Sequence, residues 1–486
     1  MKLENIIEGS KYEIYKGNKD IDIHGIEHDS RQISRNNMFI AIKGFTVDGH
    51  NYIKEAIKRG ANCIVVQKYV KIDKDGVTLV KVDDTLEALA RFSSKYYNEP
   101  SKKLNLIGVT GTNGKTSTTY LINSIFNKKD EKIGLIGTLG SIMDGKVVEN
   151  KNTTPESLTI QKHLRMMVDA KTDYCIMEVS SHSLDLKRVE YIDFQVGIFT
   201  NLTEDHLDYH LTMENYFNSK LKLFNKTNKY NIINGDDFFG KKILDNIKNT
   251  IPVITYGIDK KHDVYATDIV CHIKGADFTL NTPIGTIPIN MKLLGRFNVY
   301  NALAAASCAL VYNIDLPTIK MGLESVTGIK GRFEIVPIDK DYTVIIDFAH
   351  TPDGLEKVLT TVDQFAEGRK VVIFGAGGNR DRTKRPIMGE TVAKHADLCI
   401  VTSDNPRFEE PDDIIKDVVL GVEKANGKYI TITDRREAIE FALLNAKPKD
   451  IILLAGKGHE TYTIIKDKTI PFDEKQIVLD ILSNID

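Results

Sequence analysis

The chain has no excess of charge of either sign. Its 486 residues include 65 Lys and Arg against 67 Asp and Glu, and no block of like charge occurs. Such a balance argues against a nucleic-acid or acidic-membrane surface and favours small-molecule chemistry. Long apolar runs are also missing. The first residues lack the apolar core of a signal peptide, and no segment reaches the roughly 18 uninterrupted apolar residues of a spanning helix. We therefore expect a cytoplasmic protein.

Cysteine is scarce, and the five residues are odd in number and widely spaced: Cys63, Cys175, Cys271, Cys308 and Cys399. Most lie in apolar runs such as "NCIVV" and "DLCIV". This pattern argues against a zinc site and against a disulfide framework. It predicts buried thiols in a reducing compartment.

The length of the chain predicts more than one core, since domains typically contain about 100 to 200 residues. From about residue 100 onward, β-rich runs alternate with helical patterns, which predicts parallel sheets covered by helices. The alternation stops between about 253 and 295, where an antiparallel hairpin turning at 283–285 is expected, and restarts after about 331. We therefore predict an α/β protein of three domains: a small N-terminal α/β domain (1–99), a central α/β domain with an antiparallel β insert (100–331) and a C-terminal Rossmann-like α/β domain (332–486).

The segment "GVTGTNGKTSTTY" (108–120) follows a predicted strand and opens a predicted helix. Backbone N–H groups and a helix N-terminus can bind phosphates there, with Lys115 reaching the phosphates and Thr116 reaching Mg²⁺. Val109 stands where a strict Walker motif has its first glycine, because Gly108 lies one place too early. The alternative is a glycine-rich turn before a helix, but the coincidence of features favours an ATP-binding P-loop. Its residues are Gly111, Thr112, Asn113, Gly114, Lys115, Thr116 and Ser117.

Two polar residues follow predicted strands downstream of this loop. Glu178 ends the strand in "YCIMEVSSH", and His206 comes shortly after "GIFTN". Ligands in open α/β sheets collect at the carboxyl ends of strands, so both can lie beside Mg²⁺-ATP, although each alone is more often an ordinary surface side chain. Lys220, on an amphipathic helix, would by sequence physics alone be solvated.

Nine motifs follow one another along the chain: "TGTNGKTST", "NTTP", "MEVSSH", "TNLTEDHLDYH", "GRFNVYNALAA", "DFAHTPDGL", "GNRDRTKRPIMG", "DNPR" and "GKGHE". Together they closely resemble the Mur ligase family, ATP-dependent amide-forming enzymes of peptidoglycan precursor synthesis, over essentially the whole chain. The pattern is most similar to the member that adds the third residue of the stem peptide to UDP-N-acetylmuramoyl-L-alanyl-D-glutamate. We expect a monomer that takes ATP, this UDP-dipeptide and an amino acid, and neither nucleic acid nor membrane.

The resemblance implies that ATP phosphorylates the D-glutamyl side-chain carboxylate, giving an acyl phosphate that the incoming amine attacks. Lys220 matches a lysine that CO₂ carbamylates in the family, which would convert a repelling ammonium into an anionic ligand. The implied catalytic residues are Lys115, Glu178, His206 and Lys220, and the implied Mg²⁺ ligands are Thr116, Glu178, His206 and carbamylated Lys220. The positions implied near the nucleotide are Asn298, Arg332, Asp347 and His350.

For the UDP-sugar, the resemblance assigns the N-terminal domain and a set of polar or loop residues: Ser30, Phe45, Thr46, Val47, Asn152, Thr153, Thr154, Ser180 and Arg188. Arginine and hydroxyls suit phosphate and carboxylate groups. Some relatives carry Gln two residues before the arginine, where this chain has Leu186, a departure that concerns one sugar or peptide contact.

The resemblance implies that three segments at predicted strand ends contact the added amino acid. The implied contact residues are Arg380, Asp404, Asn405, Pro406, Arg407, Gly456 and Glu460. In resembling enzymes the "DNPR" form accompanies meso-diaminopimelate. The physics agrees, because diaminopimelate differs from lysine chiefly by a distal carboxylate, which a guanidinium binds through two charge-assisted bonds. Asp404, Asn405 and Glu460 can then take the ammonium groups.

Three alternatives remain open from the sequence. The nearest is the lysine-adding ligase of the same step. A folylpolyglutamate-type ligase shares the ATP-binding core, but "DSR" in the first domain and the "DNPR" loop argue against it. A non-catalytic P-loop module would not need Glu178, His206 and Lys220 beside the loop.

Overall fold

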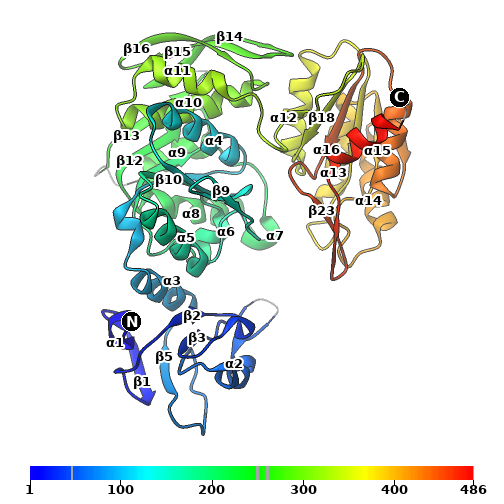
Figure 1. The fold of residues 1–486 in the computed structure, drawn as a ribbon. Coiled ribbons are helices and arrows are strands. Elements are labelled where there is room, and N and C mark those ends of the chain that lie inside the picture. Colours follow the sequence, from blue (N-terminus) through cyan, green and yellow to red (C-terminus); the bar gives the residue numbers. More distant parts are fainter. Residues whose placement is uncertain (45–46, 248–250, 259–261, 485–486) are drawn as a thin grey trace.

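The computed structural model describes residues 1–44, 47–247, 251–258 and 262–484. Its elements gather around three main sheets that follow one another along the chain (Figure 1). Of the described helices, none has the length and apolar content needed to span a lipid bilayer.

The N-terminal sheet has, in the described residues, the strand order β1-β5-β4-β3-β2. β1 is antiparallel to β5, and the other neighbours are parallel. The central strands β3 and β4 are buried on both faces, because α1 and α3 pack on one side and α2 on the other. The elements are α1 (Leu3–Ile7), β1 (Tyr12–Lys16), β2 (Gly25–Glu27), η1 (Ser30–Gln32), β3 (Asn37–Ile40), η2 (Gly49–Tyr52), α2 (Ile53–Arg59), β4 (Cys63–Val66), β5 (Thr78–Val82), α3 (Thr85–Tyr96) and η3 (Pro100–Lys103).

The middle sheet has the order β16-β15-β14-β13-β12-β11-β6-β10-β7-β8-β9 within the described ranges. Its centre is parallel, and the antiparallel strands lie at the two ends. The apolar helix α10 and α4 cover one face, and α5 and α8 cover the other. The elements from β6 to α8 are β6 (Asn105–Thr110), α4 (Lys115–Phe126), η4 (Asn127–Lys129), β7 (Ile133–Gly137), β8 (Gly140–Met143), β9 (Lys146–Val148), α5 (Ser157–Asp169), β10 (Tyr174–Glu178), α6 (Ser181–Asp185), β11 (Phe194–Phe199), α7 (Leu207–His210) and α8 (Met213–Phe224).

The remaining elements of this part are β12 (Thr227–Asn234), α9 (Phe238–Asn246), β13 (Val253–Gly257), β14 (Val264–His272), β15 (Gly275–Thr282), β16 (Gly285–Met291), α10 (Arg296–Val311) and α11 (Leu316–Ser325). The predicted antiparallel hairpin is confirmed, because β15 and β16 pair antiparallel around residues 283 and 284.

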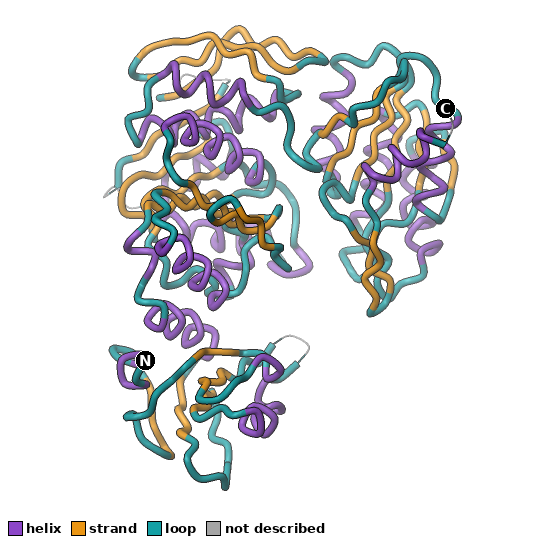
Figure 2. Tube along the Cα trace, in the orientation of Figure 1, coloured by secondary structure: helices purple, strands orange, loops and turns teal. Residues whose placement is uncertain are grey.

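The C-terminal sheet has, among the described strands, the order β17-β18-β22-β19-β20-β21 and is parallel apart from β17. Helices α12, α13 and α14 pack on one face, and α15 and α16 on the other. Figure 2 shows helices flanking the strands in this part of the chain. The elements are β17 (Glu334–Ile335), β18 (Thr343–Asp347), α12 (Pro352–Asp363), β19 (Lys370–Phe374), α13 (Lys384–His395), β20 (Leu398–Val401), α14 (Pro411–Lys424), β21 (Tyr429–Thr431), α15 (Arg435–Leu444), β22 (Ile451–Ala455), β23 (Tyr462–Ile465), β24 (Lys468–Pro471) and α16 (Glu474–Ser483).

The cysteines are free thiols, and four of them are buried: Cys63, Cys175, Cys308 and Cys399. Burial raises the pKa of each of these thiols, that of Cys399 to about 12. The prediction of a buried thiol is wrong for Cys271, which is only half-buried because it lies near the turn between β14 and β15 at the end of the sheet.

Candidate functional site

The predicted phosphate loop connects β6 to the N-terminus of α4, which begins at Lys115. Gly111 has φ +152°, and a Cβ there would lie 1.9 Å from the Thr200 hydroxyl, so only glycine fits. Gly108 lies inside β6 against Phe194, which explains its misfit to the strict Walker spacing. The loop therefore starts at Gly111.

Lys115 lies over this loop and donates hydrogen bonds to the carbonyls of Gly111 (3.0 Å) and Thr112 (2.8 Å). Burial lowers the pKa of its amine, the nearby Glu178 carboxylate opposes this shift, and Arg332 adds to it. The lysine thus lies at the positive end of α4, where an anion is favoured.

Glu178 ends β10, the parallel neighbour of β6, and is almost completely buried. Its carboxylate accepts hydrogen bonds from the Thr116 hydroxyl (3.0 Å), the Thr138 N–H (2.8 Å) and the Thr138 hydroxyl (3.1 Å). Arg332 also donates a hydrogen bond to the Thr116 hydroxyl, with 3.3 Å between Nη2 and the hydroxyl oxygen. These contacts bring the side-chain oxygen atoms of Thr116 and Glu178 together beside the loop.

Lys220 lies on α8 with 1% of its surface exposed, so the expectation of a solvated lysine from sequence physics alone is wrong. Its amine donates to the Gly111 carbonyl (2.8 Å) and lies 4.7 Å from the centre of the Tyr216 ring. Burial, followed by the charge of Lys115, lowers its pKa well below the ordinary value. The helix face that carries it packs onto the phosphate loop.

His206 immediately precedes α7 and has a left-handed backbone, with φ 53°. Burial and neighbouring cations lower the pKa of its imidazole and favour the neutral form, although Asp205 opposes this. Within the described ranges, no group of three or more His, Cys, Asp or Glu side chains gathers in a way that could hold a metal.

Contacts between the middle and C-terminal parts surround the loop. The Asp353 carboxylate accepts hydrogen bonds from Asn113 of the phosphate loop (2.9 Å) and from Thr203 (2.8 Å). Lys384 forms a largely buried ion pair with Asp205 at 2.9 Å. Sequence reasoning missed these two carboxylates, although both lie inside quoted motifs, "DFAHTPDGL" and "TNLTEDHLDYH".

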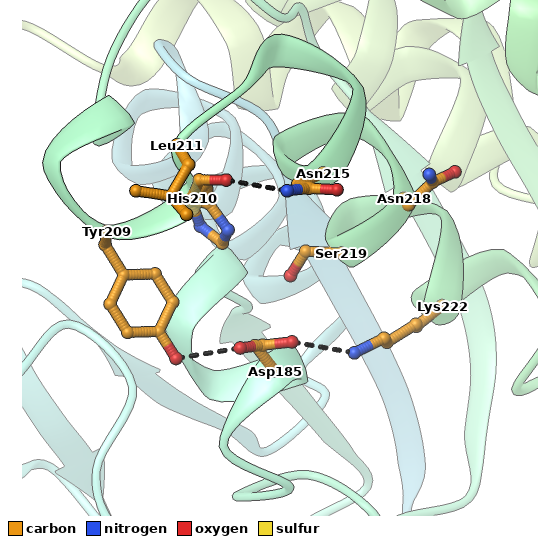
Figure 3. Close-up of a pocket in the computed structure, with 8 residues that line it drawn as sticks. All are labelled: Asp185, Tyr209, His210, Leu211, Asn215, Asn218, Ser219 and Lys222. Atoms are coloured by element: carbon orange, nitrogen blue, oxygen red, sulfur yellow. Dashed lines mark hydrogen bonds and ion pairs between the residues drawn. The ribbon is translucent and has the colours of Figure 1, made fainter.

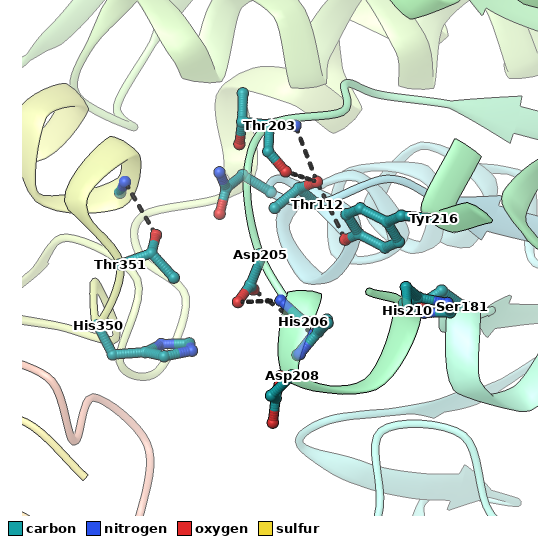
Figure 4. Close-up of polar contacts among 12 residues, drawn as sticks. Thr112, Ser181, Thr203, Asp205, His206, Asp208, His210, Tyr216, His350 and Thr351 are labelled. Carbon is teal, nitrogen blue, oxygen red and sulfur yellow. Dashed lines mark hydrogen bonds and ion pairs between the residues drawn. The ribbon is translucent and has the colours of Figure 1, made fainter. Parts of the chain in front are cut away.

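Asp205 lies beside His206, and His350 points toward both of them from the C-terminal part (Figure 4). Burial alone would raise the pKa of Asp205, but its interactions with His206, His350 and Lys384 outweigh burial and lower that pKa. The carboxylate is thus ionised and pairs with Lys384 of the C-terminal part.

The four residues predicted near the nucleotide do not all share one cavity. Asn298 and Arg332 line a pocket of about 890 Å³ between the middle and C-terminal parts, whereas Asp347 and His350 are not among its described lining residues. The Asp347 carboxylate accepts the N–H groups of Phe333 and Ala349, both at 2.7 Å. Asp347 therefore holds the backbone just before β17 and just after β18.

Three of the predicted UDP-sugar residues lie in contact with one another. The Thr154 hydroxyl donates to the Glu178 carbonyl (2.7 Å) and accepts the Ser180 N–H (3.0 Å), and Arg188 donates to the Thr154 carbonyl (3.0 Å). Thr153 accepts a hydrogen bond from Thr138, which also binds Glu178. This polar group is therefore continuous with the phosphate loop.

The other predicted UDP-sugar residues are more scattered. Ser30 is buried in η1, and Val47 and Asn152 are exposed. His28, close to Ser30, interacts electrostatically with Arg188, so the N-terminal part approaches the Thr154 group. Phe45 and Thr46 lie outside the described residues. Leu186 directly follows α6.

Arg407 lies in the loop after β20 with φ 51°, a left-handed conformation that is strained for arginine. Its guanidinium donates to the Gly378 carbonyl at 2.8 Å and lies within electrostatic range of Arg380, Asp404 and Glu460. Burial, followed by the charge of Arg380, lowers its pKa. The arginine is therefore half-buried beside an acidic pair, in contrast to the solvated surface arginine that a loop usually carries.

Lys457, which sequence reasoning missed within "GKGHE", is fully buried beneath this acidic pair. Its amine lies 4.0 Å from Asp404 and 3.7 Å from Glu460 and donates to the Asn405 side-chain oxygen at 3.3 Å. Asn405 in turn donates to Glu460 at 2.9 Å. A Cβ at Gly456 would lie 2.6 Å from the Asp404 carboxylate. The sequence pattern that could have predicted the buried Lys457 is a lysine between two glycines at the end of a buried strand.

A second, polar pocket of about 460 Å³ lies beside α8 (Figure 3). Asp185 accepts hydrogen bonds there from Tyr209 (2.8 Å) and Lys222 (3.0 Å). None of the predicted site residues is among the described residues that line it: Asp185, Tyr209, His210, Leu211, Asn215, Asn218, Ser219 and Lys222.

The fold and this site define a nucleotide-binding α/β protein with a P-loop. Comparison with family models extends this. The Mur ligase middle domain matches residues 109–309, the Mur ligase glutamate ligase domain matches 331–458, and the Mur ligase family catalytic domain matches 22–97. The chain therefore belongs to the Mur ligase family.

Two similar proteins are UDP-N-acetylmuramoyl-L-alanyl-D-glutamate--2,6-diaminopimelate ligases. That of Clostridioides difficile is 49% identical, with 100% of both chains covered, and that of Caldanaerobacter subterraneus is 46% identical, with 99% of both covered. A solved structure of a ligase with this name has 29% identity and a TM-score of 0.68, over 100% of this chain and 99% of the other. A folylpolyglutamate synthase from Mycobacterium tuberculosis, with 17% identity and a TM-score of 0.63 over 76% of this chain and 92% of the other, shares the fold alone.

Proposed function

We propose that the protein joins meso-2,6-diaminopimelate to UDP-N-acetylmuramoyl-L-alanyl-D-glutamate in the cytoplasm, through an acyl phosphate, with release of ADP and phosphate. Full-length identity of 49% to a ligase of that name supports the reaction. The observation that carries the choice of amino acid is the half-buried Arg407 beside Asp404 and Glu460. We further propose that the protein is a monomer with domains 1–99, 100–331 and 332–486, since each main sheet falls within one of these ranges.

In this mechanism the phosphate loop binds the ATP phosphates through its N–H groups, and Lys115 neutralises their charge. Arg332, already 3.3 Å from Thr116, brings a second cation to the same place from the C-terminal part. Thr154, Ser180 and Arg188 hold the UDP-dipeptide, since their group is continuous with Glu178. The chain thus supplies position and charge and needs no side-chain nucleophile.

Mg²⁺ fits the donor set next to the loop, because Thr116 and Glu178 offer hard oxygen ligands that already lie 3.0 Å apart. Bound there, it would neutralise charge on the transferred phosphoryl group. Lys220 fits the set only as a carbamate, since a buried ammonium beside Lys115 would repel a cation. His206 completes the proposed ligands: Thr116, Glu178, His206 and carbamylated Lys220.

At the amino-acid site, Arg407 would bind the distal carboxylate, and Asp404 and Glu460 would bind the ammonium groups. Lys457 keeps the two acids close together, and Asn405 orients Glu460. The remaining proposed contacts are Arg380, Pro406 and Gly456.

The test is a product assay. The purified protein is incubated with ATP, Mg²⁺, the UDP-dipeptide and either diaminopimelate or L-lysine, and the product is weighed by mass spectrometry. We expect the diaminopimelate adduct, with ADP formed in equal amount. ATP turnover that does not depend on the two other substrates would refute the proposal.

A further inference from the structure

Arg385 of α13 is the most deeply buried arginine near the proposed amino-acid site, with a side chain that is 1% exposed. Its guanidinium binds both carboxylate oxygens of Glu409, at 2.8 and 3.0 Å, and contacts Asp417 of α14 at 2.8 Å. A bidentate pair of this kind fixes orientation as well as distance. Glu409 lies two residues after Arg407 in the same loop.

Glu409 also connects two loops, which we define as the first loop (377–380, carrying Arg380) and the second loop (404–409, carrying Arg407). Its carboxylate accepts the Asn379 N–H of the first loop. Three more bonds join the loops: Gly378 N–H to the Asn405 carbonyl (2.9 Å), Arg407 to the Gly378 carbonyl (2.8 Å) and Phe408 N–H to the Asn379 side chain (3.0 Å). The two arginines are thus carried by one hydrogen-bonded unit.

The spacing of the loops is tight. A Cβ on Gly378 would lie 1.9 Å from the Pro406 carbonyl, and one on Gly377 would lie 3.0 Å from the Arg407 guanidinium. Arg407 itself has the strained φ of 51° and is held by backbone bonds to β23 and the turn after it, through the Ile464 carbonyl (3.1 Å) and the Lys466 N–H (2.7 Å). A strained residue persists only where its surroundings determine it fully.

From these contacts we infer that Arg385 and Glu409 are a positioning pair. The pair holds the two loops at the separation that lets Arg407 bind a distal carboxylate. It thereby sets the preference of the enzyme for a diamino dicarboxylate over a diamino monocarboxylate. The inference rests on the proposed function. Neither residue needs to contact the substrate for this role. Glu409 acts on Arg407 through the second loop, and Arg385 keeps Glu409 ionised and directed inward.

The test compares Glu409→Gln with Asp417→Asn. Both variants remove a carboxylate from the same buried guanidinium, but Asp417 contacts neither loop, its other partner being Arg382. Rates with diaminopimelate and with L-lysine, KM for each substrate and Tm are measured. Because a bidentate grip is lost when a guanidinium shifts by about 1 Å, we expect Glu409→Gln to raise KM for diaminopimelate roughly tenfold or more. KM for ATP should stay within about twofold.

The ratio of kcat/KM for diaminopimelate over lysine should fall by a similar factor in Glu409→Gln and remain as in the wild type in Asp417→Asn. An unchanged ratio in Glu409→Gln, or an equal fall in both variants, would overturn the inference. If Glu409→Gln is unfolded at the assay temperature, Glu409→Asp is measured instead. This variant keeps the negative charge but withdraws it from Asn379, and it must show the same fall in the ratio of kcat/KM for diaminopimelate over lysine. A wild-type protein that adds neither amino acid would refute the proposed function instead.

Discussion

Substitution Arg407→Ala should convert a selective enzyme into an unselective one. The guanidinium is half-buried, already gives one N–H to Gly378, and lies near Asp404 and Glu460. In the variant, the distal carboxylate of diaminopimelate is left unpaired, and an unpaired charge in a closed site costs about 2 to 5 kcal/mol. Because Arg407 is partly exposed, we expect a cost at the lower end of this range. About 2 kcal/mol corresponds to a roughly 30-fold loss of kcat/KM with diaminopimelate. L-lysine has no distal carboxylate, so its kcat/KM should change by less than about threefold.

The assay is the initial rate of ADP formation with each amino acid, with Tm as a check on folding. Arg407→Gly is the matched control, because glycine also removes the guanidinium but relaxes the strained φ of 51°. Both variants should lose the same factor if the guanidinium itself binds the carboxylate. An equal loss with lysine, or activity restored by glycine alone, would refute the reasoning and make Arg407 a residue of loop structure.

Three further predictions concern other parts of the chain. Lys115→Ala, which removes the cation over the phosphate loop, should lower kcat about 10²- to 10³-fold with Tm unchanged, and a near-normal rate would contradict its role. Asp353→Ala removes two cross-domain hydrogen bonds to a charged group and should raise KM for ATP about tenfold while leaving KM for the amino acid unaltered, as kinetic titration of each substrate would reveal. Burial raises the pKa of the Glu27 carboxyl from 4.5 to about 7, so the folded state binds the carboxyl proton more tightly than the unfolded state does. The free energy of unfolding therefore falls as pH rises from about 4.5 to about 7, by about 1 kcal/mol after solvent screening. Glu27→Gln should flatten the dependence of Tm on pH between these values, and an unchanged slope would exclude Glu27 as its source.

The sheets and the phosphate loop could be predicted because their signals are local. Buried parallel strands are continuous apolar runs, and the loop combines two glycines, Lys115 and Thr116 within a few residues. The structure accordingly has β6 before this loop and α4 after it, as predicted.

The environments of single polar residues could not be predicted in this way, because they depend on which elements meet in space. Lys220 has the sequence context of a solvated helix lysine, and its burial follows from the packing of α8 against a loop 109 residues away. Asp353 and Lys384 belong to helices whose own patterns are ordinary, and their importance lies in partners of the middle domain, Asn113 and Asp205. A resemblance to a family could supply the role of Lys220, but no local rule could supply these pairings.

The burial of the thiols has a practical consequence for observing movement in solution. Thiolates are the reactive form, so buried cysteines with raised pKa values react slowly with maleimides, and Cys271 is the half-exposed exception. A Cys271→Ser variant would therefore offer a nearly silent background for fluorescent labelling. One new cysteine in the exposed turn of the β23–β24 hairpin and another on the outer face of α2 would then report the distance between the two ends of the enzyme during turnover, by energy transfer between dyes.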